Sequence, residues 1–200
     1  MGTGRRGLPA NGRSCARQSR YERTAALIDA TNCYPDWRER QDTFLNYTSE
    51  SLDEPPTVTG HIVVSMDLIS SEPDASLFVY VTEIEADGAH RYVTEGMLRA
   101  LHRAHSEPPS TYRCTWPYHS LKRTDAHPLQ PNVPARIEFA LLPTSWTFSA
   151  GSRIRISSRS SALRLIFGPP GLRVSWQSEQ RLSHERRLAV STNGPSVHPH

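Results

Sequence analysis

The clearest pattern in this chain is an alternation of apolar and polar residues with a period of two. It is plainest in residues 61–70, HIVVSMDLIS. The apolar positions on one face of this stretch are Ile62, Val64, Met66 and Leu68. Side chains of a β-strand point alternately to opposite faces, so the stretch predicts a strand with one well-buried side. The earlier run FLNYTS predicts a strand that ends near Ser49.

The next pattern is a pair of strand-like runs around a turn signal. Residues 76–94, SLFVYVTEIEADGAHRYVT, place β-branched and aromatic residues on both sides of Asp87-Gly88. Asp-Gly suits a type I′ turn, so the segment predicts a β-hairpin. The following residues 95–105, EGMLRALHRAH, have local propensity for helix, with apolar residues at helical spacing.

Residues 135–156 repeat the period-two pattern. Ile137, Phe139 and Leu141 share one face, and Pro143 ends the strand. Trp146 and Phe148 begin another strand, SAGS predicts a turn, and Ile154 and Ile156 alternate with Arg153 and Arg155. We therefore expect core strands with a solvated arginine face. ALRLIFG, LRVSW and RRLAVS, further along the chain, predict short closing strands.

Many short strands separated by turns, without a series of long helices, predict an all-β sandwich. The 200 residues suit one domain, and 16 prolines with 11 glycines agree with many turns. We expect a poorly ordered basic leader at residues 1–33, the β-sandwich domain at 34–191 and a tail at 192–200.

Charge and cysteine content exclude several classes of protein. The net charge of +3 is too weak to predict nucleic-acid binding. There is no apolar stretch long enough to cross a membrane and no signal-peptide core, so we predict a soluble, cytoplasmic protein. Three widely spaced cysteines predict neither a disulfide framework nor a zinc site, and we expect no metal or cofactor.

Candidate catalytic patterns are weak. No G-x-S-x-G pentapeptide occurs, and the nearest match, GRSCA at residues 12–16, lacks the second glycine. His119 and His127 flank a polar loop in which Asp125 could orient a histidine, but structural hydrogen bonding is the favoured interpretation. Trp116, Tyr118 and Trp146 could stack against sugar rings or nucleic-acid bases, although packing in a core or interface is favoured.

Four blocks in order carry a resemblance to a known family. They are YTSESLDEPPTVTGH, LFVYVTEIEADGAHRYVTEGMLRALHR, PYHSLKRTDAHPLQP and FALLPTSWTFSAGSRIRI. The chain from about residue 34 to 156 resembles the C-terminal domain of the CocE/NonD serine hydrolases, the family of cocaine esterase and X-Pro dipeptidyl-peptidase. The resemblance implies a jelly-roll β-sandwich of the galactose-binding-like type. It also implies that EGMLRALHR is a strand.

Members of this family carry their Ser-Asp-His triad in an α/β-hydrolase domain, and no triad residue can be assigned in this chain. The resemblance therefore implies a non-catalytic domain of an ester- or amide-hydrolysing enzyme, in a truncated or split chain, whose partner is the α/β-hydrolase catalytic domain. Because loop Trp and Tyr residues are enriched at interfaces, we expect the docking surface to lie at Tyr112, Trp116, Tyr118, His119 and Lys122. The alternative is a free-standing carbohydrate-binding β-sandwich module.

Overall fold

The computed structural model describes residues 44–160, 166–167, 173–177 and 185–189. The expected leader at 1–33, the first residues of the expected domain and the expected tail lie outside this part of the chain. The strands are β1 Leu45–Thr48, β2 Thr57–Gly60, β3 Val63–Ile69, β4 Ser76–Ile84, β5 His90–Arg99, β6 Ala135–Ala140, β7 Thr144–Thr147, β8 Arg153–Ser160, β9 Ile166–Phe167, β10 Arg173–Gln177 and β11 Glu185–Ala189.

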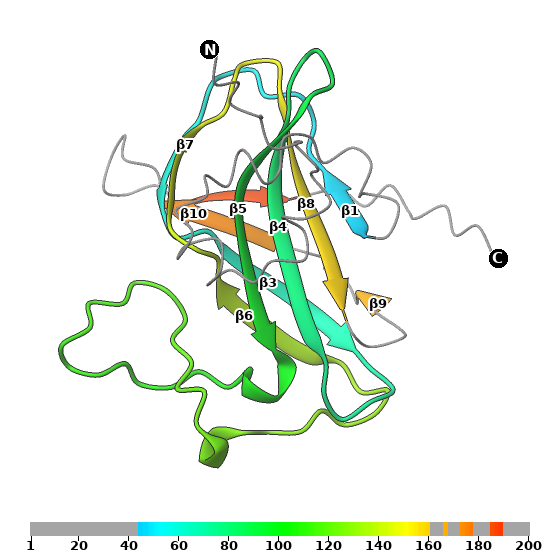
Figure 1. The fold of residues 1–200 in the computed structure, drawn as a ribbon, viewed down its shortest axis with the longest axis vertical. Coiled ribbons are helices and arrows are strands. Elements are labelled where there is room, and N and C mark those ends of the chain that lie inside the picture. The colour runs from blue at the N-terminus through cyan, green and yellow to red at the C-terminus, as the bar shows by residue number, and fades with distance from the viewer. Residues whose placement is uncertain (1–43, 161–165, 168–172, 178–184, 190–200) are drawn as a thin grey trace, which may run out of the picture.

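The strands form two antiparallel sheets and a small ribbon. The first sheet has the order β1-β8-β4-β5, and the second has the order β11-β10-β3-β6, with β9 also paired to β3. β2 pairs with β7 in the ribbon. Figure 1 shows β4, β5 and β8 in front of β3, β6 and β10, so the molecule is a two-layer sandwich. The predicted all-β class and the predicted closing strands are confirmed.

One hydrophobic core lies between the two sheets. Its members include Val64, Met66, Leu68, Ile137 and Phe139 from the second sheet and Leu77, Val79, Val81, Ile154 and Ile156 from the first. These are the inward positions of the period-two pattern, so the predicted core face is confirmed. Each large apolar side chain buried here stabilises the fold by about 1.5–3 kcal/mol.

The β4–β5 hairpin is confirmed, but the predicted turn type is wrong. Gly88 has φ +82°, whereas Asp87 does not share the left-handed conformation that a type I′ turn requires. The N–H of Gly88 donates to the carbonyl of Glu85 over 2.9 Å, and the N–H of Glu85 donates to the carbonyl of Ala89 over 2.9 Å. The loop is therefore a three-residue turn closed by a left-handed glycine. The carboxylate of Asp87 accepts the N–H of Ala89 and stabilises this form.

β5 continues through the segment whose local propensity favours helix. Residues up to Arg99 pair with β4, and one 3-10 turn, η2 (Ala100–His102), follows. Pairing with β4 supplies the main-chain hydrogen bonds and buries Leu98, which outweighs a local preference of a few tenths of a kcal/mol per residue. The strand implied by the family resemblance is confirmed for residues 95–99, whereas residues 100–102 form the 3-10 turn.

The predicted solvated arginine face is confirmed for Arg153 and wrong for Arg155. Arg153 is exposed, but Arg155 is half-buried where β1 pairs with β8. Its Nε–H donates to Thr48 Oγ1 over 2.8 Å, and burial lowers the pKa of its guanidinium. The cause is the tertiary pairing, because Thr48 lies directly opposite Arg155 in the register.

No helix in the described part of the chain has the length and apolar character that a membrane crossing requires.

Candidate functional site

A groove of about 280 Å³ lies where the edges of the two sheets meet. β5 is the edge strand of the first sheet and β6 is the edge strand of the second. The connection between them, residues 100–134, extends beyond the end of β5 (Figure 1) and includes a second 3-10 turn, η3 (Arg123–Asp125). The lining includes Met97, Trp116, Tyr118, His119, Leu121 and Leu142.

The floor of the groove is a seam between the sheets. The N–H of Leu142 donates to the carbonyl of Glu95 over 2.9 Å, and the hydroxyl of Thr94 donates to the carbonyl of Leu142 over 2.8 Å. At Gly96 the chains approach so closely that an added Cβ would lie 2.6 Å from Leu141 Cδ2 and 3.0 Å from Leu141 Cα. The absence of a side chain at this position allows the seam to close.

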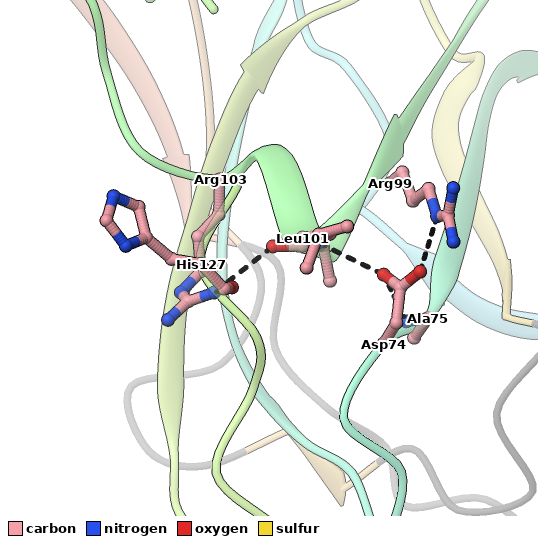
Figure 2. A network of polar contacts seen from close by, with 7 residues as sticks. Asp74, Ala75, Arg99, Leu101, Arg103 and His127 are labelled. Atoms are coloured by element: carbon pink, nitrogen blue, oxygen red, sulfur yellow. Dashed lines mark hydrogen bonds and ion pairs between the residues drawn. The ribbon is translucent and has the colours of Figure 1, made fainter. Parts of the chain in front are cut away.

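Polar contacts fix the start of the connection (Figure 2). One carboxylate oxygen of Asp74 accepts the N–H groups of Ala75, over 2.9 Å, and of Leu101, over 3.1 Å. The other oxygen pairs with the guanidinium of Arg99. Asp74 therefore holds the end of β5 and the first residues after it in one position.

The far part of the connection is tied to the same place. The N–H of His127 donates to the carbonyl of Leu101 over 2.8 Å, and Arg103 donates to the carbonyls of Ala100 and His127. Figure 2 shows Arg103 and His127 beside Leu101, next to Asp74. Because its base is closed in this way, the segment between residues 103 and 127 is held as a loop beside the sheets.

Trp116 is fixed against the sandwich by a ring contact. Its indole stacks on the imidazole of His61, with ring centroids 3.9 Å apart and an interplanar angle of 29°. Nδ1 of His61 lies 2.8 Å from the carbonyl oxygen of Leu141, at the seam. One face of Trp116 is therefore occupied, and the side chain is half-buried.

His119 fastens the loop to β6. Its Nδ1 lies 3.0 Å from the carbonyl oxygen of Ala104, and its Nε2 lies 3.0 Å from the carbonyl oxygen of Glu138. The ring of His105 packs edge-on at a centroid distance of 5.5 Å. Both nitrogens of His119 are thus engaged by main-chain oxygens, in agreement with the structural interpretation of this histidine.

Asp125 does not orient a histidine through a hydrogen bond. Its carboxylate accepts the hydroxyls of Ser120 and Thr124, and the Ser120 contact, followed by the Thr124 contact, lowers the pKa of Asp125 below its usual 3.8. The residue closes the turn that precedes η3, so the predicted structural role is the one observed.

Two large apolar side chains at the groove are mostly exposed. Met97 on β5 is 54% exposed and Leu121 on the loop is 62% exposed. Leu121 also has φ +55°, a left-handed conformation that costs a bulky residue roughly 1–2 kcal/mol. The N–H of Lys122 donates to Ser120 Oγ over 3.2 Å and helps to hold this conformation.

The residues expected at the docking surface divide into two groups. Trp116, Tyr118 and His119 line the groove. Tyr112 does not line it but packs edge-on against Tyr118 at 6.2 Å and is 57% exposed, and Lys122 is exposed beside Leu121.

Sequence reasoning missed His61 and Met97, and it did not single out Leu121 within the loop that it expected to dock. Met97 had one available signal: once EGMLRALHR is taken as a strand, its side chain lies on the face opposite that of the core residue Leu98.

The aromatic residues considered for sugar stacking are largely committed to other contacts. Trp146 packs against the core, and its Nε1–H donates to Glu83 Oε2 over 2.9 Å. Glu83 is 2% exposed and also accepts the N–H of Ser149 over 2.7 Å. These contacts, together with the stacked face of Trp116, do not favour the carbohydrate-binding alternative. Among the described residues, no three His, Cys, Asp or Glu side chains gather where they could hold a metal ion.

Known proteins are similar to this chain in sequence and in fold. Two curated relatives, each named "Putative serine esterase", come from Mycobacterium bovis and Mycobacterium tuberculosis. Each is 46% identical to this chain over 125 residues, which are 62% of the chain and 20% of the relative. The chain therefore spans about a fifth of the length of these relatives.

Solved structures agree on the fold. A CocE/NonD family hydrolase from Staphylococcus aureus matches with a TM-score of 0.51 and 16% identity, over 60% of this chain and 23% of its own. An alpha-amino acid ester hydrolase matches with a TM-score of 0.51 and 20% identity, over 72% of this chain and 23% of its own.

The family model of the X-Pro dipeptidyl-peptidase C-terminal non-catalytic domain matches residues 6–184. This match covers most of the chain, and it agrees with the β-sandwich and with the four blocks of sequence. The chain therefore belongs to the family of X-Pro dipeptidyl-peptidase C-terminal non-catalytic domains.

Proposed function

We propose that this domain supports a serine hydrolase of the CocE/NonD type by docking against its α/β-hydrolase catalytic domain. The docking surface is the groove between β5 and β6 together with the loop that carries Tyr112, Trp116, Tyr118, His119 and Lys122. Hydrolysis of ester or amide bonds is the activity of the assembled enzyme, and this domain contributes the scaffold.

The exposure of Met97 and Leu121 at one groove is the observation that carries this proposal. More than half of each side chain is exposed, and both line the same cavity as the half-buried Trp116 and Tyr118. Apolar side chains gathered at a concave site with a polar rim are typical of protein interaction surfaces. A partner that covers Met97 and Leu121 would gain roughly 25 cal/mol for each Å² of apolar surface removed from water.

The length of the relatives supports a protein partner. The matched segment makes up about a fifth of each mycobacterial relative, and the name of these relatives describes an esterase. The strained conformation of Leu121 agrees with such a role, because strain tends to persist where a side chain is needed for binding. The exposed Lys122 and Arg123 beside Leu121 favour acidic residues on the partner.

The test uses a chimera in which this chain replaces the matching 125-residue segment of the Mycobacterium tuberculosis relative. Leu121→Asp and Met97→Asp are expected to lower the hydrolysis of p-nitrophenyl butyrate at least tenfold and to lower the melting temperature of the chimera. Val133→Asp is the matched control, because Val133 is 46% exposed and lies outside the groove lining. Groove variants that behave like Val133→Asp would contradict the proposal.

A further inference from the structure

The edge of β5 that faces away from β4 accepts hydrogen bonds at Val93 and at Glu95. The carbonyl of Val93 accepts the hydroxyl of Thr144 over 3.5 Å, and the carbonyl of Glu95 accepts the N–H of Leu142 over 2.9 Å. Main-chain polar groups of a strand face alternate sides. Val93 is the extra residue where the register with β4 shifts at a β-bulge, so the alternation is counted from Glu95. The N–H and C=O groups of Met97 and Arg99 therefore face the same side as the carbonyl of Glu95, away from β4.

Hydrogen bonding along this edge resumes at Leu101, whose carbonyl accepts the N–H of His127 over 2.8 Å. Between Glu95 and Leu101, the described part of the chain gives the main chain of Met97 and Arg99 no hydrogen bond on this side. The gap opens at the groove, because Gly96, Met97 and Leu98 all line it. Met97 and Arg99 thus present strand-edge groups that no described residue pairs, next to the groove.

We propose that an extended segment of the catalytic domain enters the groove and pairs with β5 through the main chains of Met97 and Arg99. This inference rests on the proposed docking function and specifies how the partner is held. Unpaired N–H and C=O groups along a strand edge are complementary to another extended chain, and neighbouring pockets select its side chains. The cavity beside Trp116 receives an apolar side chain of the segment.

The dimensions of the gap select this occupant over a second copy of the chain. Leu142 covers the edge on one side of the gap and His127 closes it on the other. Continuous pairing of two β5 strands would need a longer free edge than two outward-facing residues. A narrow extended segment about three residues long fits, because a strand advances about 3.3 Å per residue.

Amide hydrogen exchange of the 200-residue chain and of the chimera tests the pairing. The amides of Gly96 and Leu98 face β4 and serve as internal controls that exchange slowly in both proteins. We expect the amides of Met97 and Arg99 to exchange fast in the chain alone and at least tenfold more slowly in the chimera.

If Met97 and Arg99 stay fast in a chimera whose hydrolysis responds to Leu121→Asp, docking stands and the strand pairing is wrong. If Leu121→Asp has no effect, the docking function itself fails. Slow exchange in the chain alone also overturns the inference. If that slow exchange depends on protein concentration, a second copy of the chain covers the β5 edge. If it does not, another segment of this chain covers the edge.

A peptide experiment tests the same pairing without the chimera. Overlapping peptides from the part of the Mycobacterium tuberculosis relative that this chain does not match are added to the ¹⁵N-labelled chain. We expect one peptide to shift the amide signals of Met97 and Arg99. N-methylation at every second residue of that peptide, where the N–H faces β5, should weaken binding at least tenfold. N-methylation at the residues between them, where the N–H faces away, should weaken it less than twofold. A set in which no peptide shifts both amides, or equal effects at all positions, would overturn the inference.

Discussion

The indole of Trp116 and the imidazole of His61 stack with their centroids 3.9 Å apart, and this contact joins the long β5–β6 connection to the segment just before β3. His61 is anchored in turn by the carbonyl of Leu141 at the seam between the sheets. The wall of the groove is therefore supported by the part of the fold that also forms its floor.

A double-mutant cycle on Trp116→Ala and His61→Ala should measure this contact. We expect a coupling energy of about 0.5–1.5 kcal/mol in urea unfolding, the value typical of stacked aromatic pairs. Tyr112→Ala, at a mostly exposed position of the same loop, is the control and should lower the free energy of unfolding by less than about 0.5 kcal/mol. Strict additivity of the first two substitutions would show that the contact is not formed in solution.

Leu121→Gly should separate stability from docking. Glycine accepts φ +55° without strain, so we expect the free energy of unfolding to stay unchanged or to rise by up to about 1 kcal/mol. The hydrolysis rate of the chimera should nevertheless fall, because the exposed leucine is lost. Val133→Gly is the control and should lower stability slightly without changing the rate. A larger stability loss for Leu121→Gly than for this control would speak against the strain.

Gly96→Ala should destabilise the seam by about 1–3 kcal/mol, because the new methyl group would overlap Leu141. Removing most of the Leu141 side chain should recover part of this loss, so Gly96→Ala and Leu141→Ala should be non-additive in chemical denaturation. Gly88→Ala is the comparison: it meets nothing within 4 Å but has φ +82°, and its cost should add to that of Leu141→Ala. Equal behaviour of the two glycines would exclude a steric origin.

Glu83→Ala should clearly lower the free energy of unfolding. It would remove the acceptor of two part-buried hydrogen bonds, from the Nε1–H of Trp146 and the N–H of Ser149, at about 0.5–1.5 kcal/mol for each. Glu83→Gln keeps one acceptor oxygen and should cost less. The solvent-exposed pair of Glu85 with Arg91 provides the control, and Glu85→Gln should change stability by less than about 1 kcal/mol. Unfolding curves followed by tryptophan fluorescence would give all three values.

The turn around Asp125 should loosen in acid. The hydroxyls of Ser120 and Thr124 lower the pKa of this carboxyl below 3.8, so its contribution to stability is complete above that pH. The contribution is lost as the pH falls through the lowered native value. NMR titration of the carboxyl carbon should show this pKa, and Ser120→Ala should raise it toward 3.8. A native pKa of Asp125 at or above 3.8 would contradict the contacts.

Sequence predicted the core strands well because alternation is a local property of an extended chain. Met66 and Ile137 could be assigned to a buried face without knowing their partners, since every second side chain of a strand points the same way. Trp116, Tyr118 and His119 line one groove, and their part in docking stays a prediction.

What the chain alone could not determine depends on residues that are distant in sequence. Met97 has a helical preference locally, and its pairing with Phe78 on β4 makes it part of a strand edge. Arg155 is half-buried because Thr48 lies opposite it on β1. Leu121 lines the groove because contacts of Asp74 and Arg103 close the base of its loop. The sequence by itself thus determined which residues form strands and which faces are buried. The tertiary structure decided which edges meet, which remain open and where the groove lies, because these follow from free energies of pairing that no single segment contains.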